Sequence, residues 1–220
     1  MALIYRGREV QCDSRVIDWR ESGLQFKPGS NGVRRRGSVP IQAWVWHWTA
    51  GEGNEKGCFR VLSGRGLSVQ FYIRFDGVVF QYCDVDLICA HAGKPFNGLS
   101  LGTEMQSVGD GKPNPRFVRV RARETIHGMT AMRSQFYPAQ ITAAINLRFA
   151  CAAAATDHRD RLSIGFPRGT DGLIPTRLMP LKDRLAAIEK GDHDFAHYMI
   201  SRKKRDPGLH FIERLKVVGF

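Results

Sequence analysis

Two histidines and one aspartate, far apart in this chain, have the side chains that commonly hold a zinc ion. His47 lies near the end of the apolar run 43–48, and a downstream region contains His193, His197 and Asp206. Zinc in hydrolytic sites takes three protein ligands and leaves the fourth position for water. A strand carrying His47 that meets the downstream region would therefore supply a hydrolytic zinc site.

Periodicity and turn residues indicate which elements must position these side chains. Apolar and β-branched residues from Ala43 onward predict a strand, and the Asp76-Gly77 step between two apolar runs predicts an antiparallel hairpin. Apolar residues recurring every three or four positions predict helices further along. The first expected strand starts at Ala43, within the run 43–49, and ends before the break at 51–54. The other expected strands cover 68–74, 78–83 and 100–106, and the expected helices cover 55–63, 138–155, 181–190 and 211–217.

The two longer predicted helices each have an expected packing face. In the helix over 138–155 this face carries Ile141, Ala144, Ile145, Phe149 and Ala152, and in the helix over 181–190 it carries Leu181, Leu185 and Ile188. Strands mixed with helices predict an α/β (mixed) fold, in which a central mixed β-sheet is flanked by helices.

The length of 220 residues is in the range of a single domain with one core. We expect one compact unit, with residues 1–40 as an N-terminal extension and 41–220 as the catalytic domain. The extension contains the basic, turn-rich stretch 27–37, expected to be an exposed loop, and 107–123 is expected to be an irregular insertion because Gly, Pro and Arg dominate it.

Composition limits which binding partners and which cellular compartment fit this chain. The net charge of +12 predicts attraction to acidic polymers, but no aromatic residues are interleaved with the basic ones and no docking motif is present, which argues against a nucleic-acid-binding protein. The five cysteines are scattered and lack CxxC spacing, as expected of reduced, buried thiols. No apolar run reaches the length of a membrane-spanning helix, and residues 1–9 turn charged too early for a signal peptide.

Several separated motifs occur in an order that resembles the zinc-dependent N-acetylmuramoyl-L-alanine amidases. These are the type-2 amidases, whose relatives include phage amidases and the animal peptidoglycan recognition proteins. The resemblance covers roughly 43–211 and implies a fold of this family and hydrolysis of the amide between N-acetylmuramic acid and L-alanine. The motifs are His47-Trp48-Thr49-Ala50-Gly51, Asp76-Gly77, Ala90-His91-Ala92-Gly93, Asn97, Ser100-Leu101-Gly102-Thr103-Glu104 and Lys204-Arg205-Asp206-Pro207-Gly208.

The resemblance also implies roles for individual residues. The zinc ligands fall on His47, His197 and Asp206, with one Zn²⁺ per chain. Glu104 is the expected proton-transfer group and Lys204 the expected stabiliser of the oxyanion.

The resemblance implies less direct roles for other histidines and for one asparagine. His91 and Asn97 are expected to border the cleft, in contact with substrate or beside the metal ligands. His193 is the alternative second histidine ligand, because it lies four positions before His197. His127, His158 and His210 match no family position and are expected to be surface or structural residues.

Three functions and two biological settings remain open at this stage. The chain could be an amidase, a peptidoglycan-binding module without turnover, or, least consistent with its motifs, a nucleic-acid-binding protein. As an enzyme it could be a phage or prophage endolysin, made in the bacterial cytoplasm and reaching the wall through a partner holin, or a cytosolic amidase that recycles anhydro-muropeptides. The strong positive charge favours the endolysin. We expect a monomer, and a loss of activity below about pH 6 because the histidine ligands must be neutral.

Overall fold

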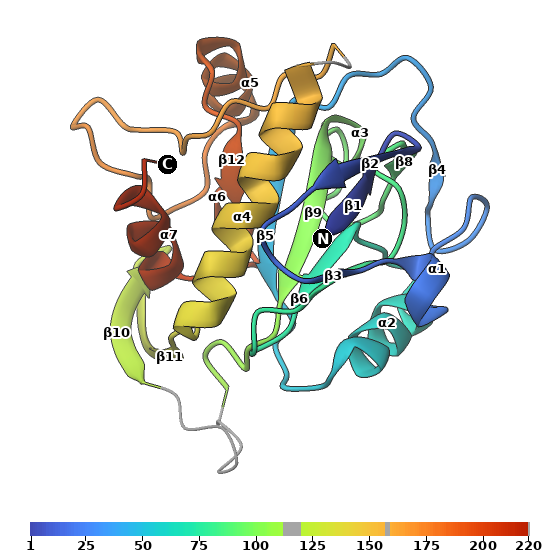
Figure 1. Cartoon of the computed structure of the whole chain (residues 1–220). Helices are drawn as coiled ribbons and strands as arrows, with labels where there is room; N and C mark the ends of the chain where they lie inside the picture. Colours follow the sequence, from blue (N-terminus) through green and yellow to red (C-terminus); the bar gives the residue numbers. More distant parts are fainter. Residues whose placement is uncertain (112–119, 157–158, 220) are drawn as a thin grey trace.

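The computed structural model, which describes residues 1–111, 120–156 and 159–219, is built on a six-stranded mixed sheet (Figure 1). The β6 and β7 strands pair antiparallel, and the other neighbours pair parallel. This confirms the mixed α/β class expected from the sequence. The strand order is β12 (Asp194–Ala196), β5 (Ala43–Trp48), β9 (Ser100–Met105), β6 (Phe71–Ile73), β7 (Val79–Gln81) and β3 (Val16–Ile17).

The two faces of this sheet bury different side chains. Phe71 and Ile73 belong to the larger core cluster, which includes residues of helix α4 (Pro138–Ala155). Tyr72, between them, points to the opposite face and belongs to a smaller cluster with residues of helix α2 (Glu55–Gly64). This alternation is the period-two pattern of a strand covered on both sides.

Most of the predicted elements are confirmed. The 43–48 strand and the helices α2, α4, α5 (Leu181–Lys190) and α7 (Leu209–Lys216) form where expected, within two residues at each end. The predicted hairpin is the antiparallel pair of β6 and β7, although both strands are shorter than expected. All five cysteines are free and buried, as expected.

The expected packing faces of two helices are partly wrong. Phe149 of α4 is 47% exposed, and the helix instead buries the side that carries Leu147 and Cys151. Two positions along a helix turn by roughly 200°, so a helix that buries Leu147 points Phe149 outward. In α5 only Ala187 and Ile188 are buried, and Leu181 and Leu185 are exposed.

The first 40 residues pack into the same core as the rest of the chain. Leu3 and Tyr5 lie on the β1 (Ala2–Tyr5) and β2 (Arg8–Gln11) hairpin and are fully buried. The stretch 27–37 is mostly exposed, but Val33 and Arg36 are buried in it. It contains β4 (Arg34–Arg35), which pairs with β8 (Leu87–Ile88), and the short helix α1 (Trp19–Ser22) precedes it.

A hairpin that the sequence did not predict joins β10 (Arg121–Ile126) to β11 (Met129–Ser134). Residues 112–119 of the expected irregular insertion lie outside the described residues, and the expectation is wrong for 121–123, which belong to β10. The strand was missed because Glu124, a charged residue, faces inward alongside Ile126. The remaining short helices are α3 (Phe96–Leu99) and α6 (His197–Ile200). Within the described ranges, no helix is both long and apolar enough to cross a bilayer.

Candidate metal centre

The central residues lie on or directly after three neighbouring parallel strands, at the same edge of the sheet. His47 and Glu104 are Cα partners on β5 and β9. The register of β12 with β5 ends at Ala196 opposite Trp46, so that the next residue, His197, lies beside His47. The carboxyl ends of parallel strands are where open α/β sheets place their ligand sites.

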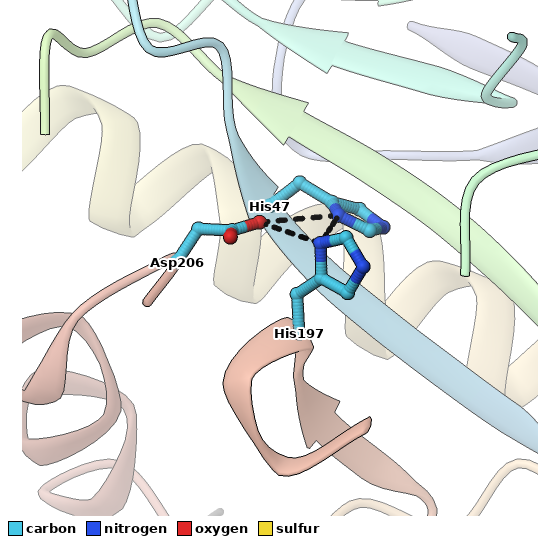
Figure 2. Close-up of side chains that lie close together, drawn as sticks. All are labelled: His47, His197 and Asp206. Carbon is cyan, nitrogen blue, oxygen red and sulfur yellow. Dashed lines mark hydrogen bonds and ion pairs between the residues drawn. The ribbon is translucent and has the colours of Figure 1, made fainter. Parts of the chain in front are cut away.

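Asp206 reaches this edge from the loop before α7, and its carboxylate faces both imidazoles (Figure 2). The Nδ1 atoms of His47 and His197 are 2.8 Å apart, and Oδ2 of Asp206 is 2.9 Å from Nδ1 of His197 and 3.2 Å from Nδ1 of His47. Within the part of the chain that the structure describes, this is the one group of three or more His, Cys, Asp or Glu side chains able to hold a metal ion.

The donor set fits a zinc ion. Ligand atoms at ordinary zinc distances in a tetrahedron lie roughly 3.3 Å from one another, so the three atoms need to separate by only a few tenths of an ångström. Two imidazoles and one carboxylate are also a ligand combination typical of catalytic zinc. A single proton cannot satisfy three converging lone pairs, whereas one divalent cation can.

The surroundings favour the protonation states that metal binding requires. Burial lowers the pKa of His47 to about 4, and the neighbouring His197 acts in the same direction. Burial by itself would raise the pKa of Asp206, but the charge of His197 and hydrogen bonds from both imidazoles bring it well below the ordinary carboxyl value. His47 is therefore neutral and Asp206 ionised at neutral pH, ready to act as ligands.

His91 lies behind His47 and fixes the orientation of its ring. Its Nδ1 is 3.0 Å from Nε2 of His47, and its own Nε2 is 3.3 Å from the hydroxyl of Ser100, which donates to the carbonyl of Phe96. If each imidazole carries its proton on Nε2, His47 donates to His91 and His91 to Ser100. The Nδ1 lone pair of His47 then points at Asp206 and His197, where a metal would sit.

Asn97, expected to border the cleft, contacts the backbone of the segment that carries His91. Its Oδ1 accepts the backbone N–H groups of His91 and Ala92, at 3.0 and 2.7 Å, and Asn97 is not among the residues that line the pocket beside the metal ligands. Gly102 provides the space for the His91 ring, because a Cβ atom at position 102 would lie 2.8 Å from it.

Glu104 borders the same pocket, and few neighbouring groups offset the cost of burying its carboxyl group. Within the described ranges, its Oε2 atom is buried and has no hydrogen-bond partner. Burial, followed by the charge of Asp206, raises its pKa well above the ordinary value, against the opposite effects of Lys204 and Arg65. A carboxyl group with a raised pKa beside a metal site is suited to exchanging protons with a reacting molecule.

The pocket has a volume of about 250 Å³ and two contrasting sides. One side is apolar and comes from α2 and the chain after it, with Val61, Leu62, Leu67 and Val69. The other side is mainly basic and is formed by Lys203, Lys204 and Arg205, which immediately precede Asp206, and Arg205 is paired with Asp110 of the same pocket at 3.1 Å. A substrate with an apolar part and acidic groups would match this surface.

The alternative histidine lies elsewhere. The Nε2 atom of His193 is 3.0 Å from the carbonyl oxygen of Ile188, and the residue is not part of the pocket. His158 lies outside the described residues, whereas His127 contacts the backbone of Lys204.

Sequence reasoning missed most of the pocket wall. Cys58, Leu62 and Arg65 of α2 and its end line the pocket. Their spacing of three and four residues, which places them on one helix face, was the signal available in the sequence. Gly102 gave no such signal, since its role depends on a ring carried by another segment.

Comparison with known proteins identifies the relatives of this chain. A family model described as N-acetylmuramoyl-L-alanine amidase matches residues 37–209. A search of curated proteins gave no match. Among solved structures, the endolysin LysCS of Clostridium intestinale URNW, an N-acetylmuramoyl-L-alanine amidase, is 14% identical with a TM-score of 0.53, covering 93% of this chain and 95% of its own. A selenomethionine derivative of AmpD is 16% identical with a TM-score of 0.53, covering 98% of each chain.

Proposed function

Because the chain belongs to the N-acetylmuramoyl-L-alanine amidase family, we propose that it cleaves the amide between N-acetylmuramic acid and L-alanine of peptidoglycan with a zinc ion held by His47, His197 and Asp206. The observation that carries the zinc proposal is the convergence of three ligand atoms from distant segments within 4.8 Å of one another. Bound there, zinc would polarise the scissile carbonyl and make water more acidic.

The chain's own residues supply the proton transfers and the charge stabilisation. Glu104, beside His47 in the sheet, is placed to take a proton from the attacking water and to deliver it to the leaving amine. Lys204 lines the same pocket and is placed to stabilise the negative charge that develops on the carbonyl oxygen. The apolar side of the pocket excludes water around the reacting amide and strengthens both effects.

The test uses purified protein loaded with one equivalent of Zn²⁺ and peptidoglycan as substrate. We expect new L-alanine amino termini to appear, and their release to stop when a chelator removes the metal. Glu104→Gln keeps the size of the side chain but removes its proton transfer, and should lower kcat by about 100-fold or more. Glu213→Gln on the exposed side of α7 is the matched control and should leave the rate unchanged. A zinc-loaded protein that binds muropeptide and releases no alanine would instead be a binding module.

For the biological setting we propose an endolysin that acts on the intact wall as a monomer, after a partner holin gives it access. The support is the net charge of +12 and the basic side of the pocket, since long-range attraction speeds encounter with an acidic polymer. Rates on intact sacculi should exceed those on soluble anhydro-muropeptides and should fall as salt is added. The reverse preference would identify a recycling amidase.

A further inference from the structure

One end of the loop that carries Asp206 is held by a carboxylate from the β10–β11 hairpin. Glu124 of β10 is 8% exposed and accepts the backbone N–H groups of Leu209 at 2.9 Å and His210 at 2.8 Å. These are the first amides of α7, whose N-cap residue, Gly208, provides no side chain. A carboxylate here gains from charge-assisted hydrogen bonds and from the helix dipole. Glu124 thus fixes where α7 begins.

The other end of the loop is held by the turn of the same hairpin. His127 has a φ of 53° in that turn, a left-handed conformation that histidine tolerates better than most residues. Its Nδ1 accepts the backbone N–H of Leu178 at 3.2 Å, so Nε2 carries the proton and donates to the carbonyl oxygen of Lys204 at 3.0 Å. The hairpin turn therefore fixes the backbone of Lys204.

Only four residues, 205–208, separate these two attachment points, and Asp206 is one of them. Its carbonyl oxygen accepts the N–H of Tyr198, at 3.2 Å, while its carboxylate faces the two imidazoles. The backbone also approaches Glu124 closely, since a Cβ atom at Gly208 would lie 2.9 Å from the carboxylate. A shift at either attachment point would be transmitted to the Asp206 carboxylate over a short distance.

We propose that Glu124 and His127 are positioning residues of the metal centre, which set the places of Asp206 and Lys204 relative to His47 and His197. The inference rests on the proposed zinc-dependent function and adds two residues that touch neither the metal ligands' side chains nor the pocket. Glu124 acts mainly on Asp206, through the start of α7. His127 acts mainly on Lys204, through its carbonyl.

The experiment compares Glu124→Gln and His127→Asn with Thr125→Ala. Thr125 lies on the exposed side of β10 and bonds Thr130 within the hairpin, at 2.7 Å between hydroxyls, so its variant alters the hairpin without touching the loop. Zinc affinity is measured on the metal-free proteins by competition with a chromophoric chelator. The visible absorption of the Co²⁺-substituted proteins reports the ligand geometry independently of turnover.

Glu124→Gln turns one acceptor toward helix N–H groups into a donor, and should weaken zinc binding by about 10- to 100-fold and change the Co²⁺ bands. His127→Asn tolerates the positive φ but is too short to reach Lys204, and should lower kcat with little change in KM. Thr125→Ala should match the wild type in all three measurements. Glu124→Asp, which keeps the charge on a shorter side chain, should give an intermediate zinc affinity and serves if Glu124→Gln does not fold.

Variants that melt at lower temperature but keep wild-type zinc affinity, Co²⁺ spectrum and kcat would overturn the inference and leave the hairpin a purely structural element. Failure of the proposed function would give a different result. The wild-type protein itself would then bind no zinc and release no alanine, and both proposals would be wrong.

Discussion

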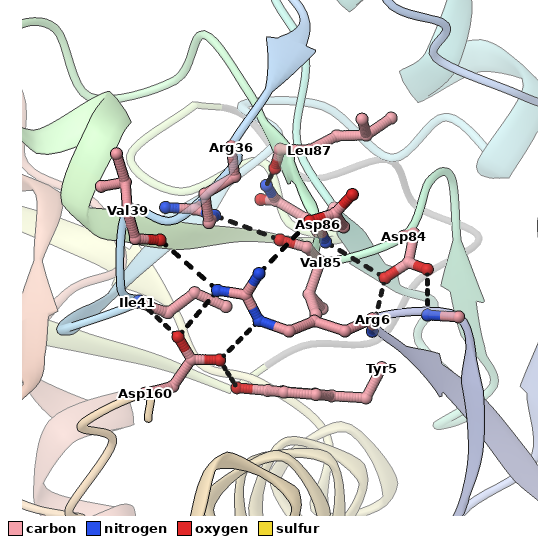
Figure 3. Close-up of polar contacts among 12 residues, drawn as sticks. Tyr5, Arg6, Arg36, Val39, Ile41, Asp84, Val85, Asp86, Leu87 and Asp160 are labelled. Carbon is pink, nitrogen blue, oxygen red and sulfur yellow. Dashed lines mark hydrogen bonds and ion pairs between the residues drawn. The ribbon is translucent and has the colours of Figure 1, made fainter. Parts of the chain in front are cut away.

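The protein buries two clusters of charged and polar side chains, and they differ in how their atoms are paired. In the first, Asp160 lies among residues of the N-terminal hairpin and the chain before β5 (Figure 3). Its carboxylate accepts hydrogen bonds from the Tyr5 hydroxyl, from two nitrogens of Arg6 and from the backbone N–H of Ile41, all between 2.7 and 2.9 Å. Each carboxylate oxygen has donors of its own, and the negative charge of Asp160 is paired with the positive charge of Arg6.

In the second cluster, the Nδ1 atoms of His47 and His197 and the Oδ2 atom of Asp206 converge on one another, and the three atoms share too few protons to give each pair its own hydrogen bond (Figure 2). The first arrangement stabilises the fold, because each acceptor has donors of its own. The second arrangement costs stability unless a cation joins the three atoms. The contrast indicates that a buried cluster whose potential ligand atoms converge on one point is a candidate binding site, whereas a cluster in which each acceptor has its own donor is a structural element.

The largest effect expected from this contrast is on activity. Asp206→Asn removes the negative charge and replaces one carboxylate oxygen with an NH₂ group, which leaves a neutral amide oxygen as a much weaker zinc ligand. We expect zinc binding and alanine release to fall by more than about 1000-fold, which corresponds to about 4 kcal/mol. Isothermal titration with Zn²⁺ and a peptidoglycan assay measure the two losses. Near-normal zinc affinity in this variant would mean that Asp206 is not a ligand.

A substitution in the Asp160 cluster should lower stability and leave activity unchanged. Asp160→Asn leaves Arg6 without its buried partner and should lower the free energy of unfolding by about 3–5 kcal/mol, measured by urea denaturation. The folded fraction should keep its activity, since neither residue lines the pocket. The control is Asp86→Asn, which removes the more exposed partner of Arg6 and should cost less than about 1 kcal/mol. Equal costs for the two variants would contradict the distinction.

The cluster of His47, His197 and Asp206 should also make the stability of the protein depend on pH. Because burial lowers the pKa of His47 from 6.5 to about 4, the unfolded state binds a proton in this window and the folded state does not. Stability of the metal-free protein therefore falls as the pH falls from 6.5 toward 4. The lowered pKa of Asp206 acts separately, since its contribution is present above the ordinary carboxyl pKa and is lost only below it.

Urea unfolding in the presence of a chelator at several pH values measures this slope. His47→Gln should have a shallower slope than the wild type between pH 6.5 and 4. An unchanged slope in His47→Gln would show that other groups dominate the acid response.

The convergence of the three candidate ligands was easier to expect from the sequence than the elements that support them. His47 and Asp206 stand in recognisable motifs, whereas His197 was expected from the family resemblance with His193 as an alternative. The β5 strand and the α4 helix follow apolar periodicities that depend on local sequence alone. β12 has three residues, too few for a period to be recognised, and β10 buries a glutamate where an apolar residue is expected. The Arg6–Asp160 pair joins positions 154 residues apart. No motif or period connects such positions, so only the tertiary structure reveals them.

The smallest effect on zinc affinity is expected at Gly102, which packs against the His91 ring behind His47. A Cβ atom there would lie 2.8 Å from the His91 ring, so Gly102→Ala should push His91 away from His47 and release the orientation of the ligand ring. We expect zinc affinity to fall by about tenfold, as for other residues that hold metal ligands in place. Gly98→Ala is the matched control, because a Cβ atom at Gly98 meets no atom within 4 Å. Equal zinc affinities in the two variants would show that His91 does not orient His47.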